Sequence, residues 1–454
     1  MLKSKQSYVL LFLFAAAFVL ITFKGLKTAQ PGDENVYYYM GKLVSEGKIP
    51  YKDFFLAHPP LQIYMIASVY KIFGFSIIAL KLIPLLSTLI TAFCIFKIAQ
   101  KFGNMEAITA SLLFLSSYSV MFNSVFSFGI DVAAMLLIAG VYFSFNRGYY
   151  LLSGLFFGLA AITRLLALVP IAVILLYFLF SGKKAFFKLS LSFLMIFLLA
   201  NGAFFLASDS YFSNVYGYHL QKTFGGKENF REYFDILKLN WILFFSALLF
   251  IFANARRQLA LFACVSLPYL LFLMSLKKIF GFYFLIAFPF LAIIGAYSAV
   301  NLAGIIPKKL KIIAFGAFTL IFIWNLSSDV IFLEKIGFTG FERGRDLAEF
   351  IVLNSDGGAM LFGDDSVTPL LALQTNRRIA LDFVDTNDQV FISGVKNLNV
   401  LLEDLKGKSL LFIARDKQGI SYFKEVREFL GKNCEFLSQF HDKMEGNYLV
   451  YRCK

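Results

Sequence analysis

The chain has 454 residues, of which 59% are hydrophobic and only 16% are charged. A soluble protein carries roughly 25% charged residues, so this composition excludes an ordinary water-soluble enzyme and predicts that lipid solvates much of the apolar surface. The formal net charge of +14 does not indicate a nucleic-acid partner, because most cations lie in short clusters between apolar runs and no basic face is interleaved with aromatic residues.

The first apolar run extends from about residue 8 to residue 23, after a short basic N-terminus. A signal peptide has a similar pattern, but no small-residue cleavage site follows cleanly, so we expect a retained transmembrane helix. A first loop of about residues 24–77 comes next.

Ten further apolar runs follow the loop. Each is long enough, or nearly so, to cross a hydrocarbon core of about 30 Å as a helix, which gives about eleven spans in total. They occupy about residues 78–99, 105–122, 128–146, 150–163, 165–181, 189–207, 237–254, 259–275, 281–301 and 312–330.

The basic clusters fall on alternate loops, as the positive-inside rule requires if the N-terminus is cytoplasmic. The first loop and everything after about residue 331 are then extracytoplasmic. Lys277 and Lys278 are the exception, because they lie on the outer side against the rule. The cations assigned to the cytoplasmic side are Lys101, Arg147, Lys183, Lys184, Lys188, Arg256, Arg257, Lys308, Lys309 and Lys311.

From about residue 334 the composition changes, with frequent charges and apolar runs of only five or six residues. Residues 344–351 and 422–430 have helical patterns, whereas residues 359–363 and 409–414 resemble buried strands. The alternation predicts a small extracytoplasmic α/β domain over 334–454, after a transmembrane domain over 1–333. Asp364 and Asp365 follow the first strand, where a capped turn is favoured over a metal site.

Two cysteines lie near the end of the chain, Cys434 and Cys453, in segments that are typical of a β-hairpin. The two side chains would lie opposite each other across that hairpin. An extracytoplasmic space is oxidising, so we expect Cys434 and Cys453 to form a disulfide.

The first loop carries the residues that could do chemistry. Asp33 and Glu34 precede a helical pattern that Gly47 would end, and Pro60 suits the first turn of a second helix. Asp33 could simply be a helix N-cap. Adjacent carboxylates just outside the membrane also suit a base that takes a proton from an acceptor hydroxyl.

This loop resembles the first-loop signature of the GT-C glycosyltransferases, most closely the protein O-mannosyltransferase and aminoarabinose transferase type. The matching residues are the Asp33-Glu34 pair, residues 47–53, the element His58-Pro59-Pro60-Leu61, and Phe73-Gly74. Residues 154–164 and 278–289 resemble later parts of the same family. Arg164 stands where the family usually has Lys.

The resemblance implies a GT-C fold and roles for individual residues. Asp33 matches the acid proposed as the catalytic base, with Glu34 beside it, and Asp131 matches a second family acid. Lys278 and Arg164 match positions near the lipid phosphate. Tyr283 lies in an element similar to the family's Tyr-Leu-Leu-Pro. A helix cap is the alternative for Asp131, and snorkelling at a span end is the alternative for Arg164.

The mechanism implied is an inverting displacement. A polyprenyl-phosphate-linked sugar donor lies in the outer leaflet, and Asp33 takes the proton of the attacking hydroxyl. Lys278, Arg164 and His58 could offset the charge on the departing phosphate. A divalent cation could do the same, but no ligand set is evident and no cofactor is assigned. His219, in the outer loop of about 208–236, could line an acceptor groove or be an ordinary interfacial residue.

The sequence therefore predicts a multi-pass plasma-membrane glycosyltransferase, a hexosyl- or pentosyltransferase whose acceptor is a protein, a lipid or a glycan. A polysaccharide ligase or polymerase is the first alternative, although the acid-bearing loop comes first in this chain rather than late. A transporter is the second alternative. It would place ionisable groups at mid-membrane in broken helices, whereas the charges here gather at the outer surface.

Overall fold

The computed structural model describes residues 4–223, 225–253, 259–416, 418–443 and 446–454. Arg256 and Arg257, two of the cations assigned to the cytoplasmic side, lie outside the described residues. The chain divides into two compact units, and each consists of three segments. Unit 1 contains Met1–Leu26, Lys81–Asn201 and Phe224–Phe338, and unit 2 contains Lys27–Leu80, Gly202–Thr223 and Thr339–Lys454.

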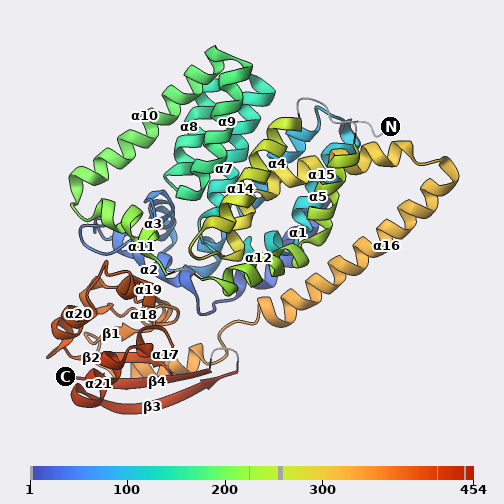
Figure 1. Cartoon of the computed structure of the whole chain (residues 1–454). Coiled ribbons are helices and arrows are strands. Elements are labelled where there is room, and N and C mark those ends of the chain that lie inside the picture. Colours follow the sequence, from blue (N-terminus) through green and yellow to red (C-terminus); the bar gives the residue numbers. More distant parts are fainter. Residues whose placement is uncertain (1–3, 224, 254–258, 417, 444–445) are drawn as a thin grey trace. The chain divides into compact units, whose positions relative to one another are not determined.

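Helices occupy all eleven predicted apolar runs (Figure 1). Their residues are apolar on every side, which suits helices surrounded by lipid and by other helices. These helices are α1 (Ser4–Lys27), α4 (Ile77–Ala99), α5 (Asn104–Leu115), α7 (Ile130–Tyr142), α8 (Tyr150–Ala161), α9 (Leu168–Ser181), α10 (Lys183–Ala207), α13 (Trp241–Leu248), α14 (Ala260–Ser275), α15 (Phe288–Ile305) and α16 (Lys308–Phe332).

Among the described residues, six helical segments are long and apolar enough to cross a membrane, in α1, α4, α7, α10, α15 and α16. A seventh span results if α12 (Lys227–Leu239) and the helix after it count as one, although they are bent by 81°. Shorter apolar helices fill the other predicted runs. The predicted number of eleven crossings thus includes several helices that are too short to span a bilayer alone.

The helices of unit 1 differ in how far they are packed. The apolar window of α15 is 61% buried, whereas that of α16 is 6% buried. Figure 1 shows α16 as a long helix that stands away from the other helices of its unit. An apolar helix with so little protein around it needs lipid as its solvent, which agrees with the membrane assignment.

Unit 2 contains two first-loop helices, α2 (Asp33–Ser45) and α3 (Leu61–Phe73), as well as the C-terminal part of the chain. Both helices begin where the sequence predicts. The C-terminal part has the four strands β1 (Met360–Gly363), β2 (Leu410–Arg415), β3 (Cys434–Asp442) and β4 (Gly446–Cys453), and the helices α17 (Gly344–Leu353), α18 (Thr368–Thr375), α19 (Asp388–Ile392), α20 (Leu398–Leu405) and α21 (Lys424–Asn433).

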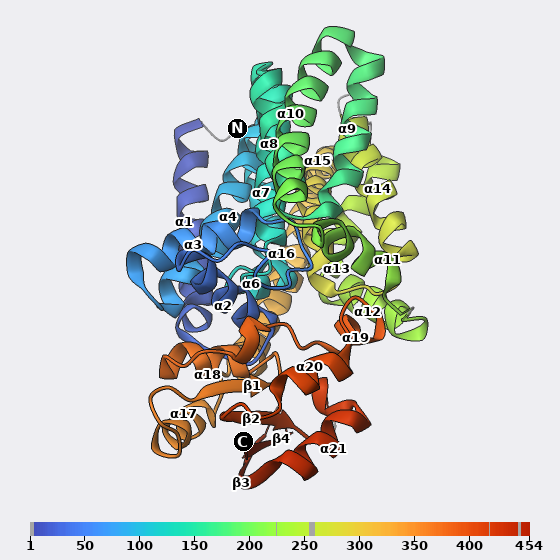
Figure 2. The same ribbon diagram turned by 90° about the vertical axis from the view of Figure 1, so that its left-hand side faces the viewer.

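The four strands form one sheet in the order β1-β2-β4-β3 (Figure 2). β1 and β2 are parallel, and the other two pairs are antiparallel. The predicted α/β alternation is therefore confirmed. The compact unit extends beyond residues 334–454, because first-loop backbone groups bond to the C-terminal part. The Phe341 amide donates to the Ala29 carbonyl over 2.9 Å.

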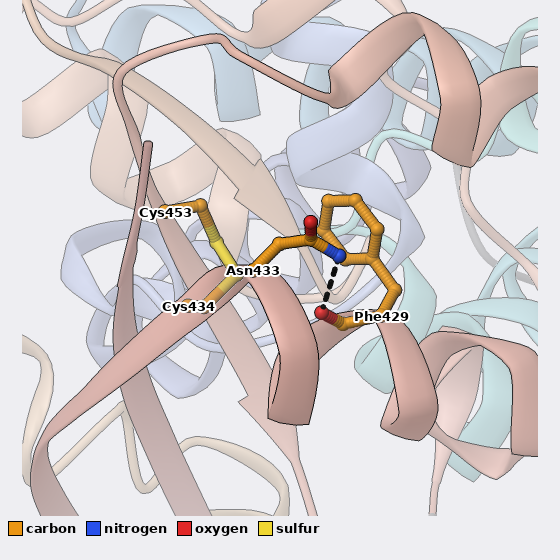
Figure 3. The surroundings of a disulfide bond; sticks show 4 residues. All are labelled: Phe429, Asn433, Cys434 and Cys453. Carbon is orange, nitrogen blue, oxygen red and sulfur yellow. Dashed lines mark hydrogen bonds between the residues drawn. A yellow bond between two sulfur atoms is a disulfide. The ribbon is translucent and has the colours of Figure 1, made fainter.

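The last two strands form the predicted hairpin, in which Cys434 is paired with Cys453. Their sulfur atoms form a disulfide, which Figure 3 shows beside the end of α21. The Asn433 side chain donates to the Phe429 carbonyl over 3.0 Å and closes that helix end. Cys94 is buried and Cys264 is exposed, and both are free.

Candidate functional site

Asp33 is the first residue of α2, after Gly32 in the cap position. Gly32 has a φ of 156°, near the edge of the region that favours glycine. Asp33 is exposed, whereas Glu34 is buried and accepts a hydrogen bond from the Tyr38 hydroxyl over 3.0 Å. The two neighbouring acids thus differ, since only Asp33 is accessible to a substrate.

The start of α2 is fixed by the turn that follows β1. The Gly32 amide donates to the Ser366 carbonyl over 2.9 Å, and the Asn35 side chain donates to the same carbonyl over 3.0 Å. One turn further along the helix, the Tyr39 hydroxyl accepts from the Ile379 amide over 2.8 Å. The C-terminal part of the chain therefore sets the position of the Asp33 backbone.

Two aspartates of the C-terminal part, Asp365 and Asp385, interact electrostatically with Asp33 at this helix start. Burial, together with the charges of Asp364, Asp385 and Asp33, raises the pKa of the Asp365 carboxyl well above its ordinary value. Burial and the charge of Asp33 raise the pKa of Asp385 to about 6. Carboxylates that share a site disfavour one another's ionisation, so the acids at this end of α2 do not all ionise together.

Two cations partly offset the negative charge of the acids in this region. Arg415, at the end of β2, lies 3.2 Å from Asp364, whose carboxylate also accepts from the Ser366 amide over 3.1 Å. The predicted capped turn is therefore present. Lys222 favours the ionised form of Asp385. Within the described parts of the chain, no group of three or more His, Cys, Asp or Glu residues is arranged to hold a metal.

The two histidines predicted as site residues, His58 and His219, are in contact within unit 2. The rings of His58 and His219 are stacked with centroids 5.1 Å apart, and the Tyr37 ring lies 6.1 Å from His58. A ring nitrogen of His219 lies 2.9 Å from the Ala57 carbonyl. Both histidines are half-buried. His219 therefore packs against the first-loop element that contains His58, Pro59 and Pro60.

The backbone before His58 is held in a strained form. Tyr51 has a φ of 70°, which is costly for an aromatic residue. Its hydroxyl donates to the His58 carbonyl over 2.7 Å, and its own carbonyl accepts from Ser208 and Ser210. Burial raises the Tyr51 pKa well above its ordinary value, so this phenol stays protonated and remains a donor.

In unit 1, Asp131 and Arg164 are both buried and interact electrostatically. Asp131 is the second residue of α7, and its carboxylate interacts with the Arg164 guanidinium and with nearby backbone amides. Arg164 lies in an extended break after α8, is only 4% exposed and donates to the Phe128 carbonyl. Snorkelling is therefore wrong for Arg164, because its charge points into protein rather than towards water.

Lys278 and Tyr283 belong to the same aromatic region of unit 1. The Lys278 amine lies 5.6 Å from the Phe280 ring centroid, and the Phe282 ring stacks on Phe128 at 4.6 Å. Tyr283 is buried against both Phe280 and Phe282. Because Phe128 also accepts from the arginine, the four predicted unit 1 residues lie along one connected set of contacts.

Asn229, at the start of α12, was not predicted from the sequence. Its buried side chain donates to the carbonyls of Leu276 and Lys277 over 3.0 and 2.9 Å, and it accepts from the Ile279 amide over 2.9 Å. These bonds fix the backbone on both sides of Lys278. A lone Asn in a polar loop gives no sequence signal, because its partners lie almost 50 residues further along the chain.

Lys81 and Asp385 were also missed. Lys81, on α4, is fully buried, donates to the Gly25 carbonyl over 3.2 Å and lies 4.7 Å from the Phe126 ring centroid. A lysine one turn inside an apolar run is a signal that could have marked it. Asp385 lies in a polar stretch with several other acids, so its pattern does not distinguish it.

A family model described as dolichyl-phosphate-mannose-protein mannosyltransferase matches residues 57–206. A comparison with curated protein sequences found no significant match.

Two solved structures of ArnT from Cupriavidus metallidurans are similar to the whole chain. The apo structure has a TM-score of 0.70 and 15% identity, and the alignment covers 99% of this chain and 98% of that one. The structure with bound undecaprenyl phosphate has a TM-score of 0.68 and 14% identity, with 97% of each chain covered. The resemblance to the GT-C glycosyltransferases is thereby confirmed, and the chain has their fold.

Proposed function

We propose that this membrane protein of GT-C fold is a glycosyltransferase that moves a sugar from a polyprenyl-phosphate-linked donor to an acceptor hydroxyl on the extracytoplasmic side. The fold likeness to ArnT and the family model over residues 57–206 support the transfer reaction. One of the ArnT structures contains undecaprenyl phosphate, which supports a lipid-linked donor for this chain.

The observation that carries the proposal is the exposed Asp33 carboxylate at the start of α2. A base must reach the proton that it removes, and Glu34 is buried and engaged by Tyr38. Asp33 takes the proton of the acceptor hydroxyl as that oxygen attacks the anomeric carbon. The bond between the sugar and the phosphate breaks, and the configuration at that carbon inverts.

The lipid phosphate leaves with negative charge that cations must offset. Lys278 is suited to this role because its backbone is fixed while its side chain is only half-buried. The Arg164 guanidinium is already oriented by Asp131 and the Phe128 carbonyl, so it needs little reorganisation to stabilise the leaving group. His58 is a third candidate, and its contacts with His219 and Tyr37 set the orientation of its ring.

The test uses purified protein with a panel of polyprenyl phosphate sugars and measures transfer to acceptors of the three predicted classes. Asp33→Asn should lower the transfer rate by about 10²–10⁴-fold, the usual contribution of a general base. Glu46→Gln is the matched control. Glu46 is a surface carboxylate that follows the C-terminal end of α2, opposite to Asp33, and it forms an ion pair with Lys42. Full activity of Asp33→Asn would refute its assignment as the base.

The stereochemistry of the product gives a second, independent test of the mechanism. Proton NMR of the first product should show the anomeric configuration opposite to that of the donor. Retention would contradict a single displacement and would require a covalent intermediate instead. Absence of transfer from every lipid-linked donor, in protein that is folded and binds those lipids, would argue against the proposed reaction as a whole.

A further inference from the structure

Unit 1 has a polar hollow whose lining contains none of the residues assigned to sugar transfer. Its volume is 280 Å³, and it forms where the end of α4 meets the end of α7. Both ends lie on the face predicted to be cytoplasmic. The residues that line the hollow are Lys97, Gln100, Lys101, Tyr142, Asn146 and Arg147.

Two of its three cations extend from the end of α4. The Lys97 amine donates to the Tyr8 hydroxyl over 2.7 Å and to the Gln100 side chain over 3.1 Å, so α1 helps to hold it. The Lys101 amine donates to the Phe145 carbonyl and lies 4.5 Å from the centroid of that ring. Both ammonium groups are thus held in defined positions by neutral partners.

The third cation comes from the short helical turn η1 (Phe143–Arg147) that continues α7. The Arg147 guanidinium donates to the Tyr142 hydroxyl over 3.1 Å and lies 5.9 Å from its ring centroid. The Asn146 amide donates to the Lys97 carbonyl over 2.7 Å and ties this turn to α4. Gly148, with a φ of 68°, ends the turn in a conformation that favours glycine.

The charge of the hollow is not balanced within it. No carboxylate lines it, and among the residues that the structure describes none of these three cations forms an ion pair with an acid. Burial also lowers the Lys101 pKa, so keeping this amine charged has a cost that a bound anion would offset. The positive-inside rule explains cations on this face, but it does not explain why three converge on one hollow with a neutral polar lining.

We propose that this hollow binds one phosphate-bearing anion, by charge-assisted hydrogen bonds from Lys101 and Arg147, with the charge of Lys97 also lining the hollow. The volume equals that of roughly nine water molecules, which is enough for a phosphate group and a small polar headgroup. On the face predicted to be cytoplasmic, anionic phospholipids present this chemistry, and free phosphate presents the same charged group. The site is separate from the transfer reaction, because none of its residues has a role there.

The test compares lipid binding by native mass spectrometry of the full chain, with phosphatidylglycerol, phosphatidylcholine and inorganic phosphate as separate probes. Lys101→Gln/Arg147→Gln should weaken phosphatidylglycerol binding about thirtyfold, as expected for the loss of two cations beside an anionic headgroup. Lys101→Arg/Arg147→Lys should bind as the unchanged protein does. Lys183→Gln/Lys184→Gln is the matched control, because it removes two exposed cations assigned to the same face but outside the hollow.

The result is decided by the contrast between these variants. Equal phosphatidylglycerol binding by the unchanged protein and Lys101→Gln/Arg147→Gln would overturn the proposal, as would an equal loss in the control. If phosphate displaces the lipid, the hollow recognises the phosphate group alone, and if it does not, the rest of the lipid contributes as well. Both of these outcomes support the proposal. Should the double variant fail to fold, the exposed Arg147→Gln alone gives the same contrast.

Discussion

The two units hold their charged groups in different ways. In unit 1 a buried acid and a buried arginine, Asp131 and Arg164, interact electrostatically. In unit 2 the exposed Asp33 lies beside Asp365 and Asp385, which have the same sign of charge. The Asp131–Arg164 region of unit 1 therefore brings opposite charges together, whereas the start of α2 in unit 2 brings acids together.

The difference follows from what surrounds each group. An isolated charge among membrane helices is costly, so it persists only with a partner. A polar domain at the surface can tolerate like charges, because water and cations such as Arg415 partly offset them. A group of acids of this kind suits proton transfer, and a fixed arginine suits a developing anion.

The largest effect is expected from breaking the pair in unit 1. Arg164→Leu leaves the Asp131 carboxylate buried without its cation, which should cost about 3–5 kcal/mol of folding free energy. The apparent thermal midpoint in detergent would measure this loss. Asp131→Asn/Arg164→Leu removes both charges and should recover most of the midpoint.

The same double variant separates two roles of the arginine. If Arg164 contacts the donor phosphate, transfer stays low although the stability returns. Recovery of transfer together with stability would show that Arg164 only compensates Asp131, and the proposed phosphate contact would then be wrong.

A smaller effect is expected at the loop that carries Lys278. Asn229→Ala removes three hydrogen bonds to this loop and should lower kcat/KM for the donor by about tenfold, since each unpaired buried group costs about 1–3 kcal/mol. The matched control is Asn240→Ala, which removes bonds to Ser119 and Ile236 at the bend between α12 and α13. It should destabilise the protein by a similar amount but leave kcat/KM almost unchanged. Equal kinetic losses in both variants would contradict a positioning role for Asn229.

A further effect is expected in unit 2 and depends on pH. Because folding raises the pKa of Asp385 to about 6, the folded chain favours its neutral form, and ionisation lowers stability as pH rises from about 4 to above 6. Asp385→Asn should therefore stabilise the protein at pH 7.5 by about 1–3 kcal/mol and leave it unchanged at pH 4. Thermal unfolding at both pH values measures this, with Asp388→Asn as a control on the same segment. Equal stabilisation at both pH values would rule out a raised pKa of Asp385 in the folded chain.

Much of the fold could be predicted because its signals are local. The apolar runs became helices, and the alternating pattern after residue 334 became the four-stranded sheet. The helix starts at Asp33 and after Pro60 also followed from capping and turn preferences. The number of crossings was harder to predict, because α5, α8 and α14 are apolar but short.

The site was predicted only where a motif marked it. Asp33, His58 and Lys278 lie in stretches that resemble a known family, and their residue types suggest their chemistry. Asn229 and Asp385 were not predicted, because each interacts with residues that are distant in sequence. The stacking of His219 on His58, about 160 residues earlier, could not be read from either segment alone.

The sequence by itself determined the solvent, the helices and the sheet elements, because hydropathy, periodicity and capping act over a few neighbouring residues. The candidate base came from the resemblance of the first loop to a known family. Only the tertiary structure decided which of the two first-loop acids is accessible, which cation is paired and which acids crowd the start of α2. These properties depend on burial and on electrostatic contacts between distant segments, and folding alone creates both.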